Sequence, residues 1–362
     1  MSRGSARTPR RAVLAAVLLA AACVSPKAHV RRALDELVRS EALAGGRIGV
    51  VVADIASGEV LAEHDGHRGF ATASNMKLLS SAVALQTLGP DYTTSTELLM
   101  VGEVEGGTLH GDLLLRGHGD PTFGDAGVDA FVAAVRAAGI ERVDGSIRGD
   151  GSWLGREQRG EGWQWDYLDA GYAAPFGGLC VDQSCVEVRV RPAGGAVAVE
   201  CRPSTGRAPV VGVELLPAGA ASRITAERAP GSDRIAVHGT IAADSAPVAV
   251  RVAVADSARF AAEVFAERLR GAGVAVGSAP AVAALGPERL LAQHDSPPLA
   301  AIVRPLLTDS NNLYAEQVWR LAARQACGSG DTAAAAWHAT ELFEALDIDT
   351  RGMVLADGSG LS

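Results

Sequence analysis

The sequence predicts a mixed α/β (α+β) fold in which a helix-containing core is divided by a long β-rich insertion. Residues 28–42 carry apolar side chains at helical spacing, and residues 74–88 are apolar nearly all round, as in a buried helix. From about residue 95 to residue 255 the chain changes to glycine and short β-like runs, and helical patterns return after residue 257. The two halves of the core are therefore far apart in the sequence.

The first 22 residues resemble an export signal. Four arginines precede an apolar run, residues 12–22, that is too short to span a bilayer. The segment Leu19-Ala20-Ala21-Ala22-Cys23 is similar to a bacterial lipoprotein cleavage site, at which Cys23 would become the lipidated N-terminus. Ordinary cleavage nearby is the alternative. In both cases we expect an exported protein of the periplasm or cell envelope, and only a lipid on Cys23 would attach it to the membrane.

Composition limits the partners of the exported chain. Without residues 1–22, 340 of the 362 residues remain, with 29 basic and 42 acidic side chains and a net charge of −13. This length suffices for two or more domains, and this charge argues against binding to nucleic acid or to an anionic membrane. The four cysteines after Cys23 could form disulfides or remain buried thiols, and the pairing stays open: Cys180, Cys185, Cys201 and Cys327.

Each element follows from its local pattern. Residues 48–54 and 60–63 predict a β-hairpin around the turn Ala56-Ser57-Gly58-Glu59, and Gly89-Pro90 ends the helix that starts at Ser74. Within the insertion, β-like runs are 97–104, 109–116, 143–149, 186–190 and 248–254, with a helix near 128–138. Further helices are predicted at 257–271, at 298–304, after Asn312 and at 333–346.

Lysine is almost absent from this chain. Of the 33 basic residues only Lys27 and Lys77 are lysine, and Lys77 follows Ser74 by three positions. A guanidinium always stays charged, whereas a buried ammonium can lose its proton, so a lysine here indicates a base. If Ser74 opens a helix, the Lys77 amine lies one turn on and reaches the Ser74 hydroxyl, which places a nucleophile beside its base. A serine that only caps the helix is the simpler alternative.

A second polar motif lies where a loop enters a helix. Ser310-Asn311-Asn312 has the form S-x-N. A serine hydroxyl can relay a proton to a leaving group, and an asparagine amide can hold a substrate carbonyl. Helix capping by Ser310 or Asn311 would explain the same residues without chemistry.

The two motifs together resemble those of active-site-serine penicillin-recognising enzymes, which combine S-x-x-K, S-x-N and K-T-G. The flanking residues are similar to the D-alanyl-D-alanine carboxypeptidase/endopeptidase family, the low-molecular-mass class C penicillin-binding proteins. The resemblance runs from about residue 28 to residue 362. Its segments are Thr72–Leu79, Gly117-His118-Gly119-Asp120-Pro121, Gly162-Trp163-Gln164-Trp165-Asp166, Gly171-Tyr172-Ala173-Ala174-Pro175, His294–Leu299, Asp309–Glu316 and Asp357–Ser362.

This resemblance implies a transpeptidase/β-lactamase-like catalytic domain made of residues 28–94 and 256–362, interrupted by the insertion at 95–255. It implies that Ser74 is the acylated nucleophile, that Lys77 is its general base, and that Ser310 relays protons while Asn312 holds the substrate amide. The implied substrates are peptidoglycan stem peptides, with β-lactams as mimics that trap Ser74, and neither metal nor organic cofactor is needed. For Asp357 we expect a turn and no catalytic role.

The K-T-G element is absent from these residues, because lysine occurs only at positions 27 and 77. In the family this element lies beyond the Asp357–Ser362 motif, on sheet strands that we expect to be missing here. We therefore expect these 362 residues alone to fold poorly or to react weakly, since the loss of one oxyanion donor costs about 10²–10³ in rate. We favour an incomplete reading of a longer gene. The alternatives are a non-catalytic peptidoglycan-binding pseudoenzyme and completion by a second polypeptide.

Overall fold

The computed structural model describes residues 25–277 and 286–362. They form two compact units, of which one ends at Ala71 and the other is Thr72–Ser362. The expected signal peptide, residues 1–22, and Cys23 lie outside the described residues. Among the residues described, no helix has both the length and the apolar character needed to cross a bilayer.

The smaller unit consists of a helix and a hairpin. Helix α2 (Pro26–Val38) begins at Ser25, whose hydroxyl accepts a hydrogen bond from the Ala28 N–H at 3.2 Å. Strands β1 (Val50–Ala53) and β2 (Val60–His64) pair antiparallel, which confirms the predicted hairpin, and α2 packs against β2. A single turn of 3₁₀ helix, η1 (Glu41–Leu43), connects α2 to the hairpin.

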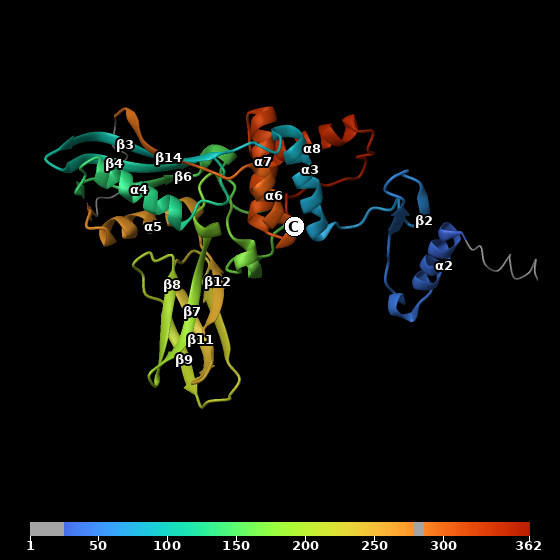
Figure 1. The fold of residues 1–362 in the computed structure, drawn as a ribbon, viewed down its shortest axis with the longest axis horizontal. Coiled ribbons are helices and arrows are strands. Elements are labelled where there is room, and N and C mark those ends of the chain that lie inside the picture. The colour runs from blue at the N-terminus through green and yellow to red at the C-terminus, as the bar shows by residue number, and fades with distance from the viewer. Residues whose placement is uncertain (1–24, 278–285) are drawn as a thin grey trace, which may run out of the picture. The chain divides into compact units, whose positions relative to one another are not determined.

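In the larger unit, four helices pack together around a buried core (Figure 1). They are α3 (Met76–Leu88), α6 (Leu299–Thr308), α7 (Asn312–Cys327) and α8 (Thr332–Ala345). Helix α3 ends at Gly89, whose φ of 83° suits a residue without Cβ, as predicted from Gly89-Pro90. Helix α7 packs against α3, α6 and α8, and Val318, Trp319 and Ala322 on it are completely buried. Segments from both ends of this unit therefore share one core.

A six-stranded sheet forms a second region, with α4 (Asp125–Ala137) and α5 (Ser257–Gly271) packed together against it (Figure 1). The strand order is β13-β5-β4-β3-β14, and β6 also pairs with β4. The strands are β3 (Ser95–Glu105), β4 (Thr108–Gly117), β5 (Arg142–Val143), β6 (Ile147–Asp150), β13 (Ala275–Val276) and β14 (Glu288–Asp295). Because β14 pairs with β3, this sheet draws on residues beyond 255, the limit that the sequence suggested for the insertion.

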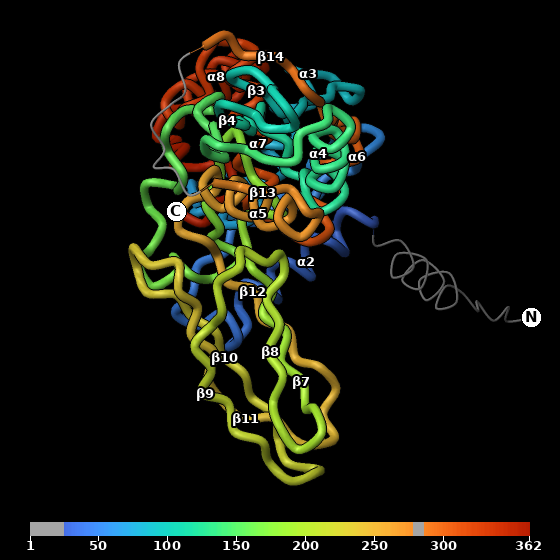
Figure 2. Tube along the Cα trace, turned by 90° about the vertical axis from the view of Figure 1, so that its left-hand side faces the viewer, coloured from blue at the N-terminus to red at the C-terminus, as the bar shows by residue number. Residues whose placement is uncertain are grey.

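Two three-stranded sheets form an elongated β region (Figure 2). One has the order β12-β7-β8, with β7 (Cys185–Ala193), β8 (Ala196–Arg202) and β12 (Val248–Ala253). The other has the order β10-β11-β9, with β9 (Val210–Leu216), β10 (Arg223–Arg228) and β11 (Ile235–Ala242). Strands β8 to β11 are not resolved individually by the sequence pattern, because their alternation is weak and glycines interrupt it. Their valines and isoleucines join the core of the six-stranded sheet.

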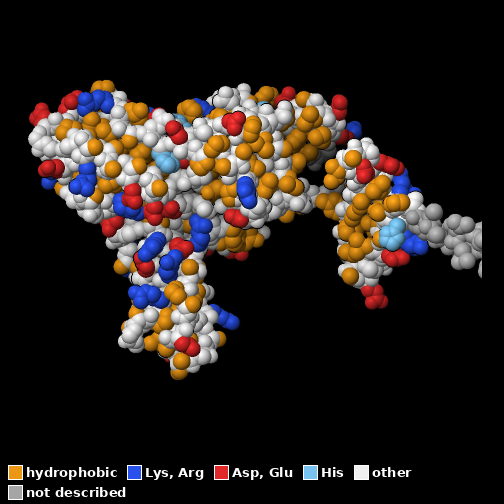
Figure 3. Space-filling model, viewed as in Figure 1, with side chains coloured by type: hydrophobic (Ala, Val, Ile, Leu, Met, Phe, Trp, Pro, Cys, Tyr) orange, Lys and Arg blue, Asp and Glu red, His pale blue; other side chains and the backbone are white. Residues whose placement is uncertain are grey.

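Four 3₁₀ turns lie between β6 and β7: η3 (Ser152–Leu154), η4 (Trp165–Tyr167), η5 (Gly171–Ala173) and η6 (Asp182–Ser184). On the face of the larger unit shown in Figure 3, acidic and basic side chains are interspersed rather than segregated. That face carries no continuous basic surface of the kind that nucleic-acid binding requires.

Candidate active site

Ser74 lies at the start of α3, in the tight turn η2 (Ala73–Asn75), and is exposed. The preceding Ala73 has a φ of 44°, a left-handed conformation that residues with a Cβ rarely adopt and that is typical of functional sites. One turn on, Lys77 is only 2% exposed, and its Nζ donates to Ser74 Oγ at 3.0 Å. The predicted contact between amine and hydroxyl is confirmed.

The Lys77 amine makes its second hydrogen bond to a segment far along the chain, at Ser359, 282 positions later. Lys77 Nζ donates to the carbonyl of Ser359 at 2.9 Å, and Ser80 Oγ donates to the carbonyl of Gly358 at 2.6 Å. Gly360, with a φ of 76°, passes so close to the turn before α3 that a Cβ on it would lie 1.8 Å from the Ala73 carbonyl oxygen. Residues 357–360, which we call the carbonyl loop, are therefore fitted to the start of α3.

Two buried carboxylates shape the carbonyl loop. Asp357 Oδ1 accepts the Gly360 N–H at 2.6 Å, and its Oδ2 accepts the Trp163 indole N–H at 2.9 Å. Glu316 Oε1 on α7 accepts the N–H groups of Gly358 and Ser359, each at 3.0 Å. The predicted turn at Asp357 is thus present, and the indole of Trp163 and the carboxylate of Glu316 are supports that sequence reasoning missed.

Burial governs the charges of this cluster. It lowers the pKa of the Lys77 ammonium below the ordinary value of lysine, while the nearby Asp357 and Glu316 charges oppose the shift. Burial, reinforced by the charge of Asp357, raises the pKa of Glu316 to about 7. Burial also acts to raise the pKa of Asp357, but hydrogen bonds led by those from Ser362 and Trp163 outweigh it and lower that pKa. An amine with a lowered pKa beside an exposed hydroxyl can act as a proton acceptor.

The S-x-N residues lie where α7 begins. Asn311 caps the helix, because its Oδ1 accepts the Tyr314 N–H at 3.1 Å, so the capping alternative holds for this residue. Ser310 is exposed with a φ of 54°, and Asn312 Nδ2 donates to the Tyr172 carbonyl at 2.7 Å. Helices α3 and α7 pack together, but the hydrogen bonds recorded for the described residues do not join this motif to Ser74 or Lys77.

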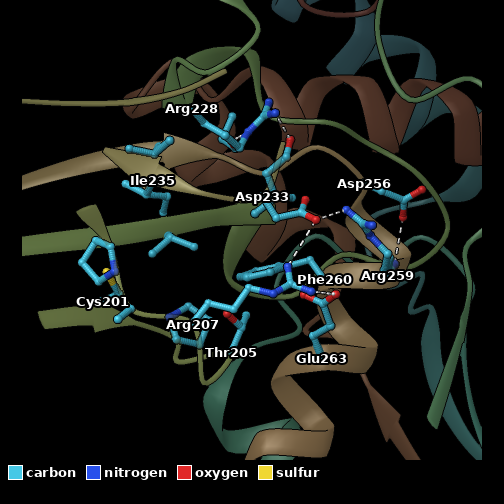
Figure 4. Close-up of a pocket in the computed structure, with 17 residues that line it drawn as sticks. Cys201, Thr205, Arg207, Arg228, Asp233, Ile235, Asp256, Arg259, Phe260 and Glu263 are labelled. Atoms are coloured by element: carbon cyan, nitrogen blue, oxygen red, sulfur yellow. Dashed lines mark hydrogen bonds and ion pairs between the residues drawn. The ribbon is translucent and has the colours of Figure 1, made fainter. Parts of the chain in front are cut away.

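A separate cavity lies between α5 and the two three-stranded sheets (Figure 4). Arg207 crosses it, with ion pairs to Asp233 at 3.2 Å and to Glu263 at 2.7 Å. Cys201 lines the cavity, but burial raises the pKa of its thiol, so this sulfur is a poor nucleophile. The cavity contains neither Ser74 nor Lys77, and the geometry favours the α3 site for chemistry.

The remaining expectations concern cysteines and metals. Cys180, Cys185, Cys201 and Cys327 are free thiols in the structure. Of the alternatives left open by the sequence, the structure therefore has unpaired thiols. Within residues 25–277 and 286–362, no cluster of three or more histidine, cysteine, aspartate or glutamate side chains has the arrangement of a metal site.

The fold is that of a penicillin-binding protein. The crystal structure of penicillin-binding protein 4 (dacB) from Haemophilus influenzae matches with a TM-score of 0.71 at 24% identity, over 87% of this chain and 71% of that one. A second structure of that protein, complexed with a β-lactam, matches with a TM-score of 0.63 at 21% identity, over 87% and 70% of the two chains.

Sequence comparison defines the family. Residues 30–362 match the model of the D-Ala-D-Ala carboxypeptidase 3 (S13) family, and the chain belongs to this family. It is 34% identical to the D-alanyl-D-alanine carboxypeptidase of Actinomadura sp. (strain R39) over 353 residues, 92% of this chain but 64% of the relative. It is 25% identical to DacB of H. influenzae over 339 residues, 88% of this chain and 68% of the relative. The chain thus spans about two thirds of the length of these relatives.

Proposed function

We propose that this protein is a serine-type D-Ala-D-Ala carboxypeptidase/endopeptidase that acts on peptidoglycan stem peptides through an acyl-enzyme on Ser74 and is sensitive to β-lactams. The observation that carries the proposal is the 3.0 Å contact between the exposed Ser74 hydroxyl and the buried Lys77 amine. The names of the carboxypeptidase relatives support the substrate class, and the β-lactam complex of the H. influenzae protein supports the inhibitor class.

In the proposed reaction, neutral Lys77 takes the proton of Ser74 while Ser74 Oγ attacks the carbonyl carbon of the penultimate D-alanine. The N-terminus of α3 favours the negative charge that develops there. The C–N bond then breaks, and the leaving amine takes a proton from the Lys77 ammonium by way of Ser310. Asn312 holds the substrate amide. Water then gives a proton to the neutral Lys77 amine as its oxygen attacks the ester carbonyl. The bond to Ser74 Oγ breaks, the proton passes from Lys77 to Oγ, and the free acid leaves.

Covalent labelling of the full chain tests this proposal. We expect a fluorescent penicillin to label part of the chain at a single site, which mass spectrometry locates on Ser74, and Ser74→Ala to abolish the labelling. Lys77→Arg keeps a positive charge but removes the base, so we expect the labelling rate to fall about 10²–10⁴-fold. An adduct on another residue, or none on a folded wild-type chain, contradicts the proposal.

The labelled fraction also tests the sequence-based expectation that these 362 residues react weakly without a K-T-G element. Stoichiometric labelling of this chain alone would show that expectation to be wrong. A folded chain that sediments with peptidoglycan but takes no label would support the non-catalytic alternative.

We propose in addition that the protein is exported, with Cys23 as the candidate lipid site. The basic and apolar pattern of residues 1–22 supports this. Mass determination of the mature N-terminus distinguishes a lipid on Cys23 from ordinary cleavage nearby.

A further inference from the structure

Glu316 is a buried ionisable residue that the proposed reaction does not use. Its side chain is 0% exposed within α7. Oε1 accepts two N–H groups of the carbonyl loop, whereas Oε2 has no hydrogen-bond partner among the described residues. The nearest cation recorded for it, Arg320 Nε, is 3.9 Å from Oε2, an ion pair without a hydrogen bond. A carboxylate in this position costs stability, and its burial calls for a functional explanation.

We propose that Glu316 is a positioning residue for Lys77, an inference that rests on the function proposed above. Its carboxylate holds the Gly358 and Ser359 N–H groups so that the Ser359 carbonyl accepts a hydrogen bond from the Lys77 amine. Its negative charge stabilises the ammonium that forms when Lys77 takes the proton of Ser74.

The contacts form one continuous path from carboxylate to amine. Glu316 Oε1 and the Ser359 N–H are 3.0 Å apart, and the carbonyl of Ser359 is 2.9 Å from Lys77 Nζ. Gly358 strengthens this arrangement, because its N–H also meets Glu316 and its carbonyl accepts the Ser80 hydroxyl. The loop is therefore held by α3 on one side and by α7 on the other.

The charges that face this path come from three elements. Lys77 lies on α3, Glu316 and Arg320 lie on α7, and Asp357 lies in the carbonyl loop. Arg320 is shared with Glu157, whose Oε2 is 2.8 Å from Arg320 Nη1. Asp357 accepts hydrogen bonds from Trp163 and Ser362, and its charge, like that of Glu316, acts to raise the pKa of Lys77. Glu316 reaches the loop from a different element, α7. Its Oε1 accepts the loop N–H groups, and its Oε2 has only the distant Arg320 as a recorded ion-pair partner among the described residues.

The scarcity of lysine makes a direct test possible. Lysine labelled with ¹³C at Cε gives only two side-chain signals in the full chain, one from Lys27 and one from Lys77, and Lys27→Arg assigns them. Titration of the Lys77 signal reads the pKa of its amine without any turnover. Glu316→Gln keeps an acceptor oxygen for the two N–H groups but removes the charge. We expect it to lower the pKa of Lys77 by about one pH unit, with Lys27 unchanged.

Matched variants separate charge from structure. Glu157→Gln removes a carboxylate from the far side of Arg320 and should move the Lys77 titration by less than about 0.3 pH units. If Glu316→Gln fails to fold, the wild type still decides, because ionisation of Glu316 should add an inflection to the Lys77 titration near pH 7. A single-step wild-type titration, or equal Lys77 pKa values in wild type and Glu316→Gln, overturns the inference.

The penicillin-labelling rate gives the second readout. Its acid limb should move to lower pH by the same amount in Glu316→Gln, since the limb reports the amine that must be neutral. Labelling with an unmoved limb overturns the inference and leaves the proposed function standing. If no labelling occurs but Glu316→Gln still shifts the Lys77 titration, the proposed function is overturned and the influence of Glu316 on Lys77 stands.

Discussion

Gly360→Ala should weaken the contact between the carbonyl loop and the start of α3. The φ of 76° at Gly360 costs a residue with a Cβ about 1–2 kcal/mol. The added Cβ would also lie 1.8 Å from the Ala73 carbonyl oxygen, a backbone atom, and such overpacking costs about 1–3 kcal/mol more. We expect the free energy of unfolding to fall by about 2–5 kcal/mol, and the labelling of Ser74 to slow because the displaced loop no longer holds Lys77.

Gly352→Ala is the matched control. Gly352 has a φ of 80°, but a Cβ there would meet nothing within 4 Å, so only the conformational cost of about 1–2 kcal/mol applies. Urea unfolding of both variants and of the wild type, with labelling rates measured alongside, isolates the contribution of the clash. Equal losses of stability in the two variants, or an unchanged labelling rate in Gly360→Ala, would refute this reasoning.

Two further predictions concern the buried carboxylates. Trp163→Phe removes the indole donor of Asp357, and we expect urea unfolding to show a loss of about 1–3 kcal/mol; no loss would mean that the bond contributes nothing. The folded-state pKa of Glu316, about 7, exceeds its ordinary value of 4.5, so its protonated form stabilises the fold at low pH and this contribution is lost as pH rises through 7. From pH 5 to pH 8 the unfolding free energy of the wild type should therefore fall by about 3 kcal/mol relative to Glu316→Gln, and parallel pH profiles would contradict this.

Helix α3 and the contact between Ser74 and Lys77 were predictable because their signals are local. The apolar pattern of residues 74–88 predicts a buried helix. Helix α3 (Met76–Leu88) confirms the helix, but its burial is partial, since Leu78 is 58% exposed. The spacing of Ser74 and Lys77 requires only helical geometry to bring the two groups together. The helices at 257–271, 298–304 and 333–346 were predicted for the same reason, and α5, α6 and α8 agree to within a few residues.

Long-range pairing was not predictable from a single sequence. Strand β14 (Glu288–Asp295) joins the sheet through β3, more than 180 residues earlier, and no local pattern records that partnership. For the same reason the sequence did not predict the hydrogen bond from the Lys77 amine to the Ser359 carbonyl. Glu316 left a weak signal, since Arg320 follows it four residues later on the same face of a helix, a spacing that allows an ion pair. The catalytic roles of Ser74, Lys77, Ser310 and Asn312 remain predictions.

The hydrogen bond from Lys77 to the Ser359 carbonyl spans 282 positions of the chain, so it can form only after both segments have been synthesised. While the polypeptide is being synthesised, α3 emerges long before the carbonyl loop that encloses its amine. Until the carbonyl loop closes over it, the Lys77 amine meets water, and the burial that lowers its pKa is absent. The contact between Ser74 and Lys77 would thus reach its folded environment only after the carbonyl loop has docked against α3.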